Sequence, residues 1–199
     1  MIPVRLSAEP ATFNMKVRRP GQRWLATHPT GRPHSYWKAA LGDLATAFND
    51  LCAYAAMYVP LGVVEHYLSR DNPKRQENRQ LAYEWSNYRF ASEWLNSKKG
   101  TLDDTVLDPF QVGRDWFEIT LPDLQLRVTD RCPRRFRTKA QFTIERLGLR
   151  DDERILRQRR KWMVEYETTG DTGVLERNAP LLAEAVKKQH PRNTGQVGR

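Results

Sequence analysis

A carboxylate and an imidazole stand side by side at Glu65 and His66, at the end of an apolar, β-branched run. Two asparagines follow, Asn87 and Asn96, and the second opens onto a Lys-Lys-Gly sequence. Together these residues offer an oxygen ligand for a hard metal ion, a general base, an amide that can orient the base, and cations for phosphate. Those are the groups that hydrolysis of a phosphodiester requires.

The sequence around these residues predicts the elements that position them. Apolar runs on either side of a Pro-Leu-Gly turn indicate two strands, and a long polar segment follows as a loop. An asparagine or serine can cap a short helix, and a glycine can end it. The predicted elements are strands at 57–59 and 63–67, a loop at 68–84, and a helix that begins at Ser86 or Asn87 and ends at Gly100.

The flanking segments divide the chain into four parts. Apolar residues recur every three or four positions over 36–54, which predicts an amphipathic helix. Short strands are expected at 116–119 and 124–128, and helices at 139–147, 151–168 and 173–189. We therefore expect an extended basic arm at 1–35 with a possible short strand at its start, a core at 36–130, a basic helical subdomain at 131–190, and a disordered tail at 191–199.

The charge of the chain is unevenly distributed. The net charge is +9 over 199 residues. Lys and Arg outnumber Asp and Glu by seven to one in residues 1–40 and by seventeen to nine in residues 131–199, whereas residues 41–130 hold nine basic and fourteen acidic residues. An acidic centre suits a metal site and basic flanks suit a polyanion, so the pattern is typical of a nucleic-acid enzyme. A basic protein with no nucleic-acid partner would show the same net charge.

Several classes of protein are disfavoured. The two cysteines, Cys52 and Cys132, form no Cys-x-x-Cys pair, so neither a structural zinc site nor a disulfide framework is expected. A reducing, cytoplasmic setting is the default prediction. The start lacks the apolar region of a signal peptide, and the longest apolar stretch is too short to cross a membrane. No phosphate-binding Gly-x-x-x-x-Gly-Lys-Ser/Thr loop occurs, so any nucleotide-driven control must come from another protein, such as an ATPase.

Five short motifs in this order resemble the ββα-metal core of the HNH endonuclease family. The match covers residues 51–120 and is most similar to the HNH proteins of bacterial anti-phage loci, of the Septu and retron-effector type. The motifs are Cys52-Ala53-Tyr54, Val64-Glu65-His66-Tyr67, Ala82-Tyr83-Glu84-Trp85-Ser86-Asn87-Tyr88-Arg89, Asn96-Ser97-Lys98-Lys99-Gly100 and Leu107-Asp108-Pro109-Phe110.

The resemblance implies a role for each residue of the set. His66 takes the place of the general base that activates water, and Asn87 takes the place of the residue that braces the loop and orients the base. Glu65 and Asn96 fall where the family binds its metal, and oxygen ligands favour one Mg²⁺ or Mn²⁺ ion over zinc. Many relatives carry two Cys-x-x-Cys pairs for a structural zinc, but here the second region reads Ala91-Ser92-Glu93-Trp94, and apolar packing must replace that metal.

Basic residues near these motifs are candidates for contacts with phosphate. Lys98, Lys99 and Arg89 flank the motifs, and three cations share a face of the helix predicted at 151–168. Those three are Arg157, Arg160 and Lys161. The basic run 154–161, which contains these three residues, could instead be only the solvated face of that helix. Asp108, which precedes a proline, is read as a turn residue rather than a metal ligand.

The sequence therefore predicts an α+β protein: a ββα-metal HNH core with an N-terminal helix and a C-terminal helical subdomain. Its predicted activity is metal-dependent hydrolysis of DNA in anti-phage defence, with DNA and a regulatory ATPase as partners and no membrane. Two alternatives remain open. One is an HNH-like module that binds nucleic acid or a partner without cutting, and the other is a nuclease directed at RNA, such as tRNA.

Overall fold

The computed structural model describes residues 1–189. It is an α+β arrangement of helices with two small antiparallel sheets. Its principal elements are α1 (Arg19–Thr27), α2 (Leu41–Ala47), β1 (Gly62–His66), β2 (Tyr88–Ser92), α3 (Glu93–Lys99), β3 (Phe117–Ile119), β4 (Leu126–Val128), α4 (Arg134–Arg146), α5 (Glu153–Thr169), α6 (Thr172–Asn178) and α7 (Pro180–Gln189). A π-helical turn at Asn14–Arg18 and 3-10 turns at Tyr36–Ala40, Gln76–Tyr83, Trp85–Asn87, Asp103–Thr105 and Pro109–Gln111 complete the set.

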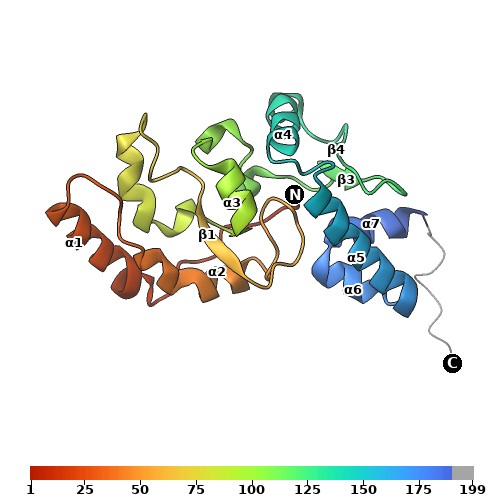
Figure 1. Ribbon diagram of the computed structural model, residues 1–199, viewed down its shortest axis with the longest axis horizontal. Coiled ribbons are helices and arrows are strands. Elements are labelled where there is room, and N and C mark those ends of the chain that lie inside the picture. The colour runs from red at the N-terminus through yellow and green to blue at the C-terminus, as the bar shows by residue number, and fades with distance from the viewer. Residues whose placement is uncertain (190–199) are drawn as a thin grey trace.

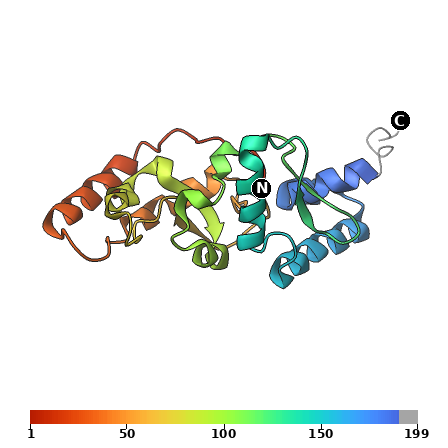
Figure 2. The same ribbon diagram turned by 90° about the horizontal axis from the view of Figure 1, so that it is seen from above.

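The molecule is elongated, with α1 at one end and α5, α6 and α7 at the other (Figures 1 and 2). The β1–β2 sheet and α3 lie between these ends. One contiguous cluster of buried apolar side chains nevertheless runs through both halves, from Met1 to Val186. The predicted boundary at residue 130 therefore does not separate two independent cores.

The central sheet pairs β1 with β2, antiparallel, so that Glu65 lies opposite Arg89 and His66 opposite Tyr88. The strand at 63–67 was expected, but its partner was not: residues 88–92 were predicted to be helical. They are extended because aromatic and small side chains of this segment pack into the core on both faces of the sheet. The helix begins only at Glu93, and it ends at Gly100 as predicted, where φ is +51°.

The first 35 residues are not an extended arm. The π-helical turn and α1 form a nearly continuous helix over 14–27. Phe13, Val17 and Gly21 recur every four residues and are buried along one face. A Cβ on Gly21 would lie 2.2 Å from the ring of Tyr83, so this glycine is what lets the helix approach the core. No strand forms at the start of the chain, over 1–10.

The C-terminal half holds four helices where three were predicted. The helix expected at 173–189 is divided at Ala179, because Pro180 lacks an N–H for the helix that precedes it and starts α7 instead. Both strands expected in this region form, as β3 and β4; they pair antiparallel, and α4 and α7 pack against this small sheet. The predicted tail at 191–199, with His190, lies outside the described residues.

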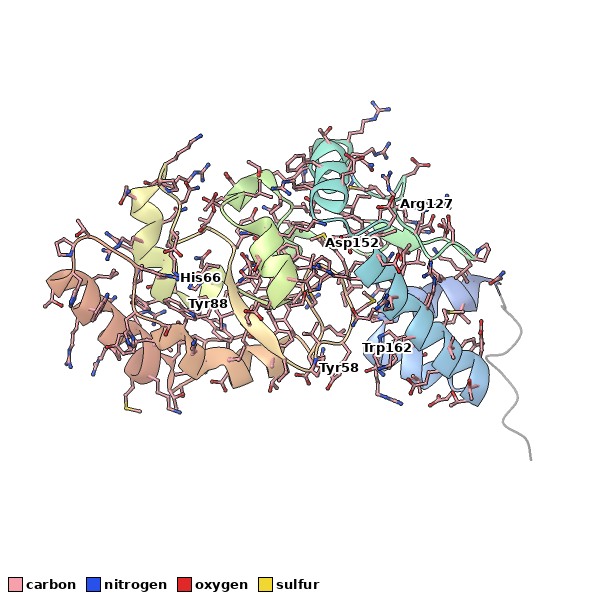
Figure 3. The ribbon with its side chains drawn as sticks, viewed as in Figure 1. Tyr58, His66, Tyr88, Arg127, Asp152 and Trp162 are labelled. Atoms are coloured by element: carbon pink, nitrogen blue, oxygen red, sulfur yellow. The ribbon has the colours of Figure 1, made fainter. Side chains whose placement is uncertain are left out.

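Two contacts attach α5 to the loop that leads into β1. The side-chain amide of Gln158 donates to the carbonyl oxygen of Tyr58 at 2.8 Å, and the rings of Tyr58 and Trp162 meet edge to face at 6.4 Å (Figure 3). A third contact, the ion pair between Lys98 and Asp152 at 3.1 Å, joins α3 to the start of α5. In residues 1–189, no helix combines the length and the apolar character needed to span a membrane.

Candidate functional site

Glu65 and His66 are consecutive residues of a strand, so their side chains leave it on opposite faces. The Glu65 carboxylate is 1% exposed. Its Oε1 lies 2.7 Å from Lys99 Nζ, and the Tyr54 hydroxyl donates to its Oε2 at 2.9 Å. Burial, together with the negative charge of Glu65, raises the pKa of Tyr54, which keeps the phenol protonated as a donor. The carboxylate thus has partners inside the protein.

His66 is buried too, and both of its ring nitrogens are hydrogen bonded. Nε2 lies 3.0 Å from the carbonyl oxygen of Ala82, which can only accept, so Nε2 carries the proton. Nδ1 lies 3.0 Å from an Arg70 guanidinium nitrogen, which can only donate, so Nδ1 carries the lone pair. Burial, with a contribution from the Arg70 charge, lowers the pKa of His66 to about 3. The ring is therefore neutral at pH 7, and Nδ1 is its basic atom.

Aromatic side chains hold the His66 ring in place. The rings of Trp37 and Tyr88 meet it edge to face, at centroid distances of 4.9 Å and 5.1 Å. Figure 3 shows His66 and Tyr88 close together near the end of β1. The Tyr88 hydroxyl donates to the carbonyl oxygen of Ala82 at 2.7 Å, the same oxygen that accepts from His66. The orientation of the imidazole is therefore set from three sides.

Asn87 closes the loop that carries this carbonyl group. Its Oδ1 accepts from the backbone N–H of Leu68 at 2.8 Å, and its Nδ2 donates to the carbonyl oxygens of Leu68 and Leu81 at 3.0 Å and 3.1 Å. Asn87 thus joins the start of the loop to the residue before Ala82. Within residues 1–189, Asn87 forms no hydrogen bond with His66 itself, so any effect on the base is exerted through the loop.

Two of the residues predicted to contact phosphate are buried instead. Arg89 forms a bidentate pair with Asp108, with both N–O distances at 2.8 Å, and its guanidinium stacks on Phe110 at 3.6 Å. Lys99 is 1% exposed and, besides Glu65, donates to the carbonyl oxygens of His66 and Tyr67. Neither side chain reaches the surface, so the prediction that they hold phosphates is corrected. Asp108 does serve as a turn residue, since its side chain accepts from the N–H of Phe110.

Asn96 faces a cleft of about 670 Å³ between α3, β1 and the segment 32–41, which we call the Asn96 cleft. Its wall also carries Glu93, one helical turn before Asn96, and basic and aromatic side chains. The lining residues are Trp24, Arg32, Pro33, His34, Ser35, Trp37, Lys38, Leu41, Val63, Val64, Arg70, Glu93 and Asn96. His66 Nδ1 lies 3.0 Å from the guanidinium of Arg70, which is one of these lining residues.

The expected pair of metal ligands is not assembled in this arrangement. Glu65 is not among the residues that line the Asn96 cleft, and its oxygens are bonded to Lys99 and Tyr54. The oxygen-bearing side chains that do line it from α3 are Glu93 and Asn96. Over the described 1–189 range, no three His, Cys, Asp or Glu side chains cluster closely enough to hold a metal. Glu65 and Asn96 as placed here therefore do not fit the predicted divalent ion.

A second cleft, of about 940 Å³, lies between α3 and α5, and we call it the α3–α5 cleft. It brings together three residues predicted to contact phosphate, Lys98, Arg157 and Lys161. Its other lining residues are Trp94, Asp152, Glu153, Arg154 and Gln158. Lys98 pairs with Asp152, at the start of α5, at 3.1 Å. Arg160 is exposed on α5 but does not line this cleft.

One functional candidate, Arg70, escaped the sequence analysis, and a second, Arg154, entered it only as the first residue of the basic run 154–161. Arg154 lines the α3–α5 cleft and its guanidinium lies 5.5 Å from the Trp94 ring centroid. Its position, three residues before Arg157 and seven before Lys161, is the helical signal that could have revealed it. Arg70 had a weaker signal, because it stands in a loop, where spacing does not predict contacts.

The arrangement as a whole combines a neutral imidazole with a defined basic atom, a cleft that carries amide and carboxylate oxygens, and a neighbouring basic cleft on the other side of α3. Its chemistry is suited to an anionic substrate with a backbone long enough to occupy both clefts. Comparison of this chain with protein-family models, with curated proteins and with solved structures finds no match.

Proposed function

We propose that the protein is an HNH-type endonuclease that hydrolyses phosphodiester bonds in DNA, with His66 as the general base. One observation carries the proposal: the Ala82 carbonyl holds the proton on Nε2, so the lone pair of a neutral imidazole is on Nδ1, which faces Arg70, a residue that lines the Asn96 cleft. Burial lowers the pKa of His66 to about 3, so the ring is unprotonated at pH 7, as a base must be; a pKa this far below the working pH also makes it a weak base while it is buried against Arg70. The succession β1, β2 and α3 agrees with the ββα order that the motifs resemble.

In this proposal the residues divide the work. His66 accepts a proton from the attacking water at Nδ1, and Ala82 and Asn87 keep its ring oriented. Arg32, Lys38 and Arg70 lie around the Asn96 cleft, where they can offset the charge of the phosphate under attack. The cations of the α3–α5 cleft hold neighbouring phosphates, which adds affinity with little sequence information.

Dependence on Mg²⁺ or Mn²⁺ belongs to the proposal, because amide and carboxylate oxygens favour these ions. To take part as a ligand, Glu65 would have to leave Lys99. The anti-phage role and the partner ATPase that the resemblance implies depend on the nuclease activity and are proposed with it.

A second candidate is a module that binds nucleic acid without cutting it. The observation that favours it is that both key side chains already have partners inside the protein: Glu65 is paired with Lys99, and Arg70 donates to Nδ1 of His66. Both clefts would still be open to a polyanion.

The deciding experiment compares wild type with His66→Ala on supercoiled plasmid at low salt, with Mg²⁺, with Mn²⁺ and with EDTA. His28→Ala is the matched control, because that imidazole is exposed and stacks on Trp24. We expect nicking or linearisation by wild type and by His28→Ala, dependent on the ion, and a loss of about 100-fold or more in His66→Ala. Circular dichroism verifies that each variant is folded.

Other outcomes separate the alternatives. Equal mobility shifts for wild type and His66→Ala, with no cleavage by either, would support the binding module. Cleavage of tRNA but not of plasmid or single-stranded DNA would assign the same chemistry to RNA.

A further inference from the structure

The basic atom of His66 is covered in the free protein. Because Nε2 donates to Ala82, Nδ1 is the only ring nitrogen that can accept a proton, and Arg70 donates to it at 3.0 Å. A water molecule cannot occupy the same position as this guanidinium nitrogen. Proton transfer to Nδ1 therefore requires that Arg70 move.

The hydrogen bonding of Arg70 is incomplete. Its Nε is buried and has no hydrogen-bond partner in the described residues. Its one ion pair in that part of the chain is with Asp71, at 3.2 Å, and the Asp71 side chain is 39% exposed. Burial lowers the pKa of Arg70, and the nearby Arg32 adds repulsion. A buried N–H without an acceptor is unfavourable, so an anion that accepts from it would be bound favourably.

The guanidinium is also within reach of a ligand. Arg70 lines the Asn96 cleft and the adjoining cleft formed by residues 30–32 and 70–79. Its guanidinium carbon lies 4.3 Å from the centroid of the Trp37 ring, a flat surface over which the group can shift and keep its contact. The side chain is 15% exposed, so it is covered enough to be ordered and open enough to be contacted.

We propose that Arg70 is a phosphate-binding residue that covers His66 in the free protein and uncovers it when a phosphodiester enters the Asn96 cleft. The inference rests on the proposed function, in which His66 is the base. A guanidinium binds a phosphate through two parallel, charge-assisted hydrogen bonds, whereas a neutral imidazole offers it one acceptor. A phosphate therefore binds Arg70 more strongly than His66 Nδ1 does. The base is uncovered only when a phosphate is present.

The test observes the imidazole rather than the reaction. The ¹⁵N chemical shift of His66 Nδ1 is recorded at pH 7.5 in EDTA while the thymidine dinucleotide dTpdT, which contains one phosphodiester, is added. The signal of an unprotonated ring nitrogen moves downfield when it loses a hydrogen-bond donor. We expect a saturable downfield shift of Nδ1 in wild type, with the Nε2 proton retained.

Two variants test whether the change in the Nδ1 signal depends on Arg70. Arg70→Met removes the guanidinium, so Nδ1 should already resonate downfield without dTpdT, and the apparent dissociation constant for dTpdT should rise about tenfold. Arg23→Met removes an exposed cation of α1 that does not line the Asn96 cleft, so the starting position of Nδ1 and its response should stay as in wild type. A thermal melt confirms folding; the wild-type titration stands even if Arg70→Met fails to fold.

The outcomes distinguish this inference from the proposed function. An Nδ1 signal that dTpdT leaves unmoved in wild type overturns the covering role of Arg70, even if the plasmid is cut. An identical response in folded Arg70→Met and wild type overturns it as well. An Arg70-dependent shift in a protein that cuts no nucleic acid would support the phosphate-binding role and reject the nuclease.

Discussion

Two neighbouring lysines of α3 have opposite surroundings. Lys99 is buried under the β1–β2 sheet, where it pairs with Glu65 and caps two carbonyl groups. Lys98 faces the α3–α5 cleft and pairs with Asp152, and both of these side chains are partly exposed. The buried group, which we call the sheet cluster, also contains Arg89 and its pair, Asp108.

This contrast shows how the same residue type can serve structure or binding. A buried charge whose partner is removed remains in a medium of low dielectric, which is strongly destabilising. An exposed charge regains water when its partner is lost, so its pair contributes little to stability. The cations of the sheet cluster therefore stabilise the fold, and those of the α3–α5 cleft remain available for a polyanion.

The largest expected effect on the free energy of unfolding comes from replacing Lys99. Lys99→Met leaves the Glu65 carboxylate buried with only Tyr54 as a charge-stabilising partner, so the free energy of unfolding should fall by about 3–5 kcal/mol. Denaturant titration measures the change. Lys98→Met, one residue away, should change it by less than about 0.5 kcal/mol.

Glu65→Gln distinguishes a structural role of this carboxylate, as the partner of Lys99, from its predicted role as a metal ligand. As the partner of Lys99 it should cause a comparable loss of stability, and the double variant Glu65→Gln with Lys99→Met should lose less than the sum of the two. Equal stabilities of the Lys98 and Lys99 variants would remove the contrast on which this comparison depends.

A smaller loss is expected at Arg89. Lysine keeps the positive charge but cannot form the bidentate pair with Asp108 or the flat contact with Phe110, so Arg89→Lys should cost about 2 kcal/mol. The control is Arg127→Lys, whose pair with Glu118 lies at the surface (Figure 3) and should matter by less than about 0.5 kcal/mol. If the two substitutions cost the same, burial is not what distinguishes the pairs.

The pH dependence of stability should reveal the buried imidazole. The pKa of His66 is lowered from its ordinary value of 6.5 to about 3, so between these limits the unfolded chain binds a proton that the folded protein does not. Stability must then fall as the pH falls from about 6.5 toward 3, by at most about 1.4 kcal/mol for each pH unit.

Unfolding between pH 7 and 4.5 measures this slope before most carboxylates titrate. His66→Gln should flatten it, while His28→Ala, with an exposed ring, should keep it. A wild-type stability that is constant over this interval would contradict the burial of His66.

The smallest effect on stability, and the clearest on binding, is expected in the α3–α5 cleft. The double substitution Arg157→Gln with Lys161→Gln should leave the unfolding free energy within about 0.5 kcal/mol. The affinity for a short DNA duplex should fall about tenfold at low salt, and the salt dependence of log K should lose a slope of about two. Arg134→Gln, an exposed arginine of α4, is the control; an equal effect there would mean that the cleft has no special role.

The sequence was informative where a pattern is local. The strand that ends at His66, the helix stop at Gly100, the strands near 117–119 and 126–128 and the long helix α5 all follow from short-range signals. β2 was missed because its aromatic residues suit a helix or a buried strand equally, and only pairing with β1 decides between them. The helix over 14–27 was missed because its buried face begins in a segment rich in proline and arginine, although Phe13, Val17 and Gly21 do keep a spacing of four.

The sequence by itself determined an α+β chain, a basic character concentrated at its flanks, and an ordered set of carboxylate, imidazole and amide residues. The tertiary structure alone decided which charges are free. It buried Lys99 and Arg89, placed Lys98 beside Arg157 and Lys161, and set Arg70 against His66. The physical reason is that the energy of a charge depends on its neighbours and its distance from water, and both arise from contacts between residues far apart in the chain.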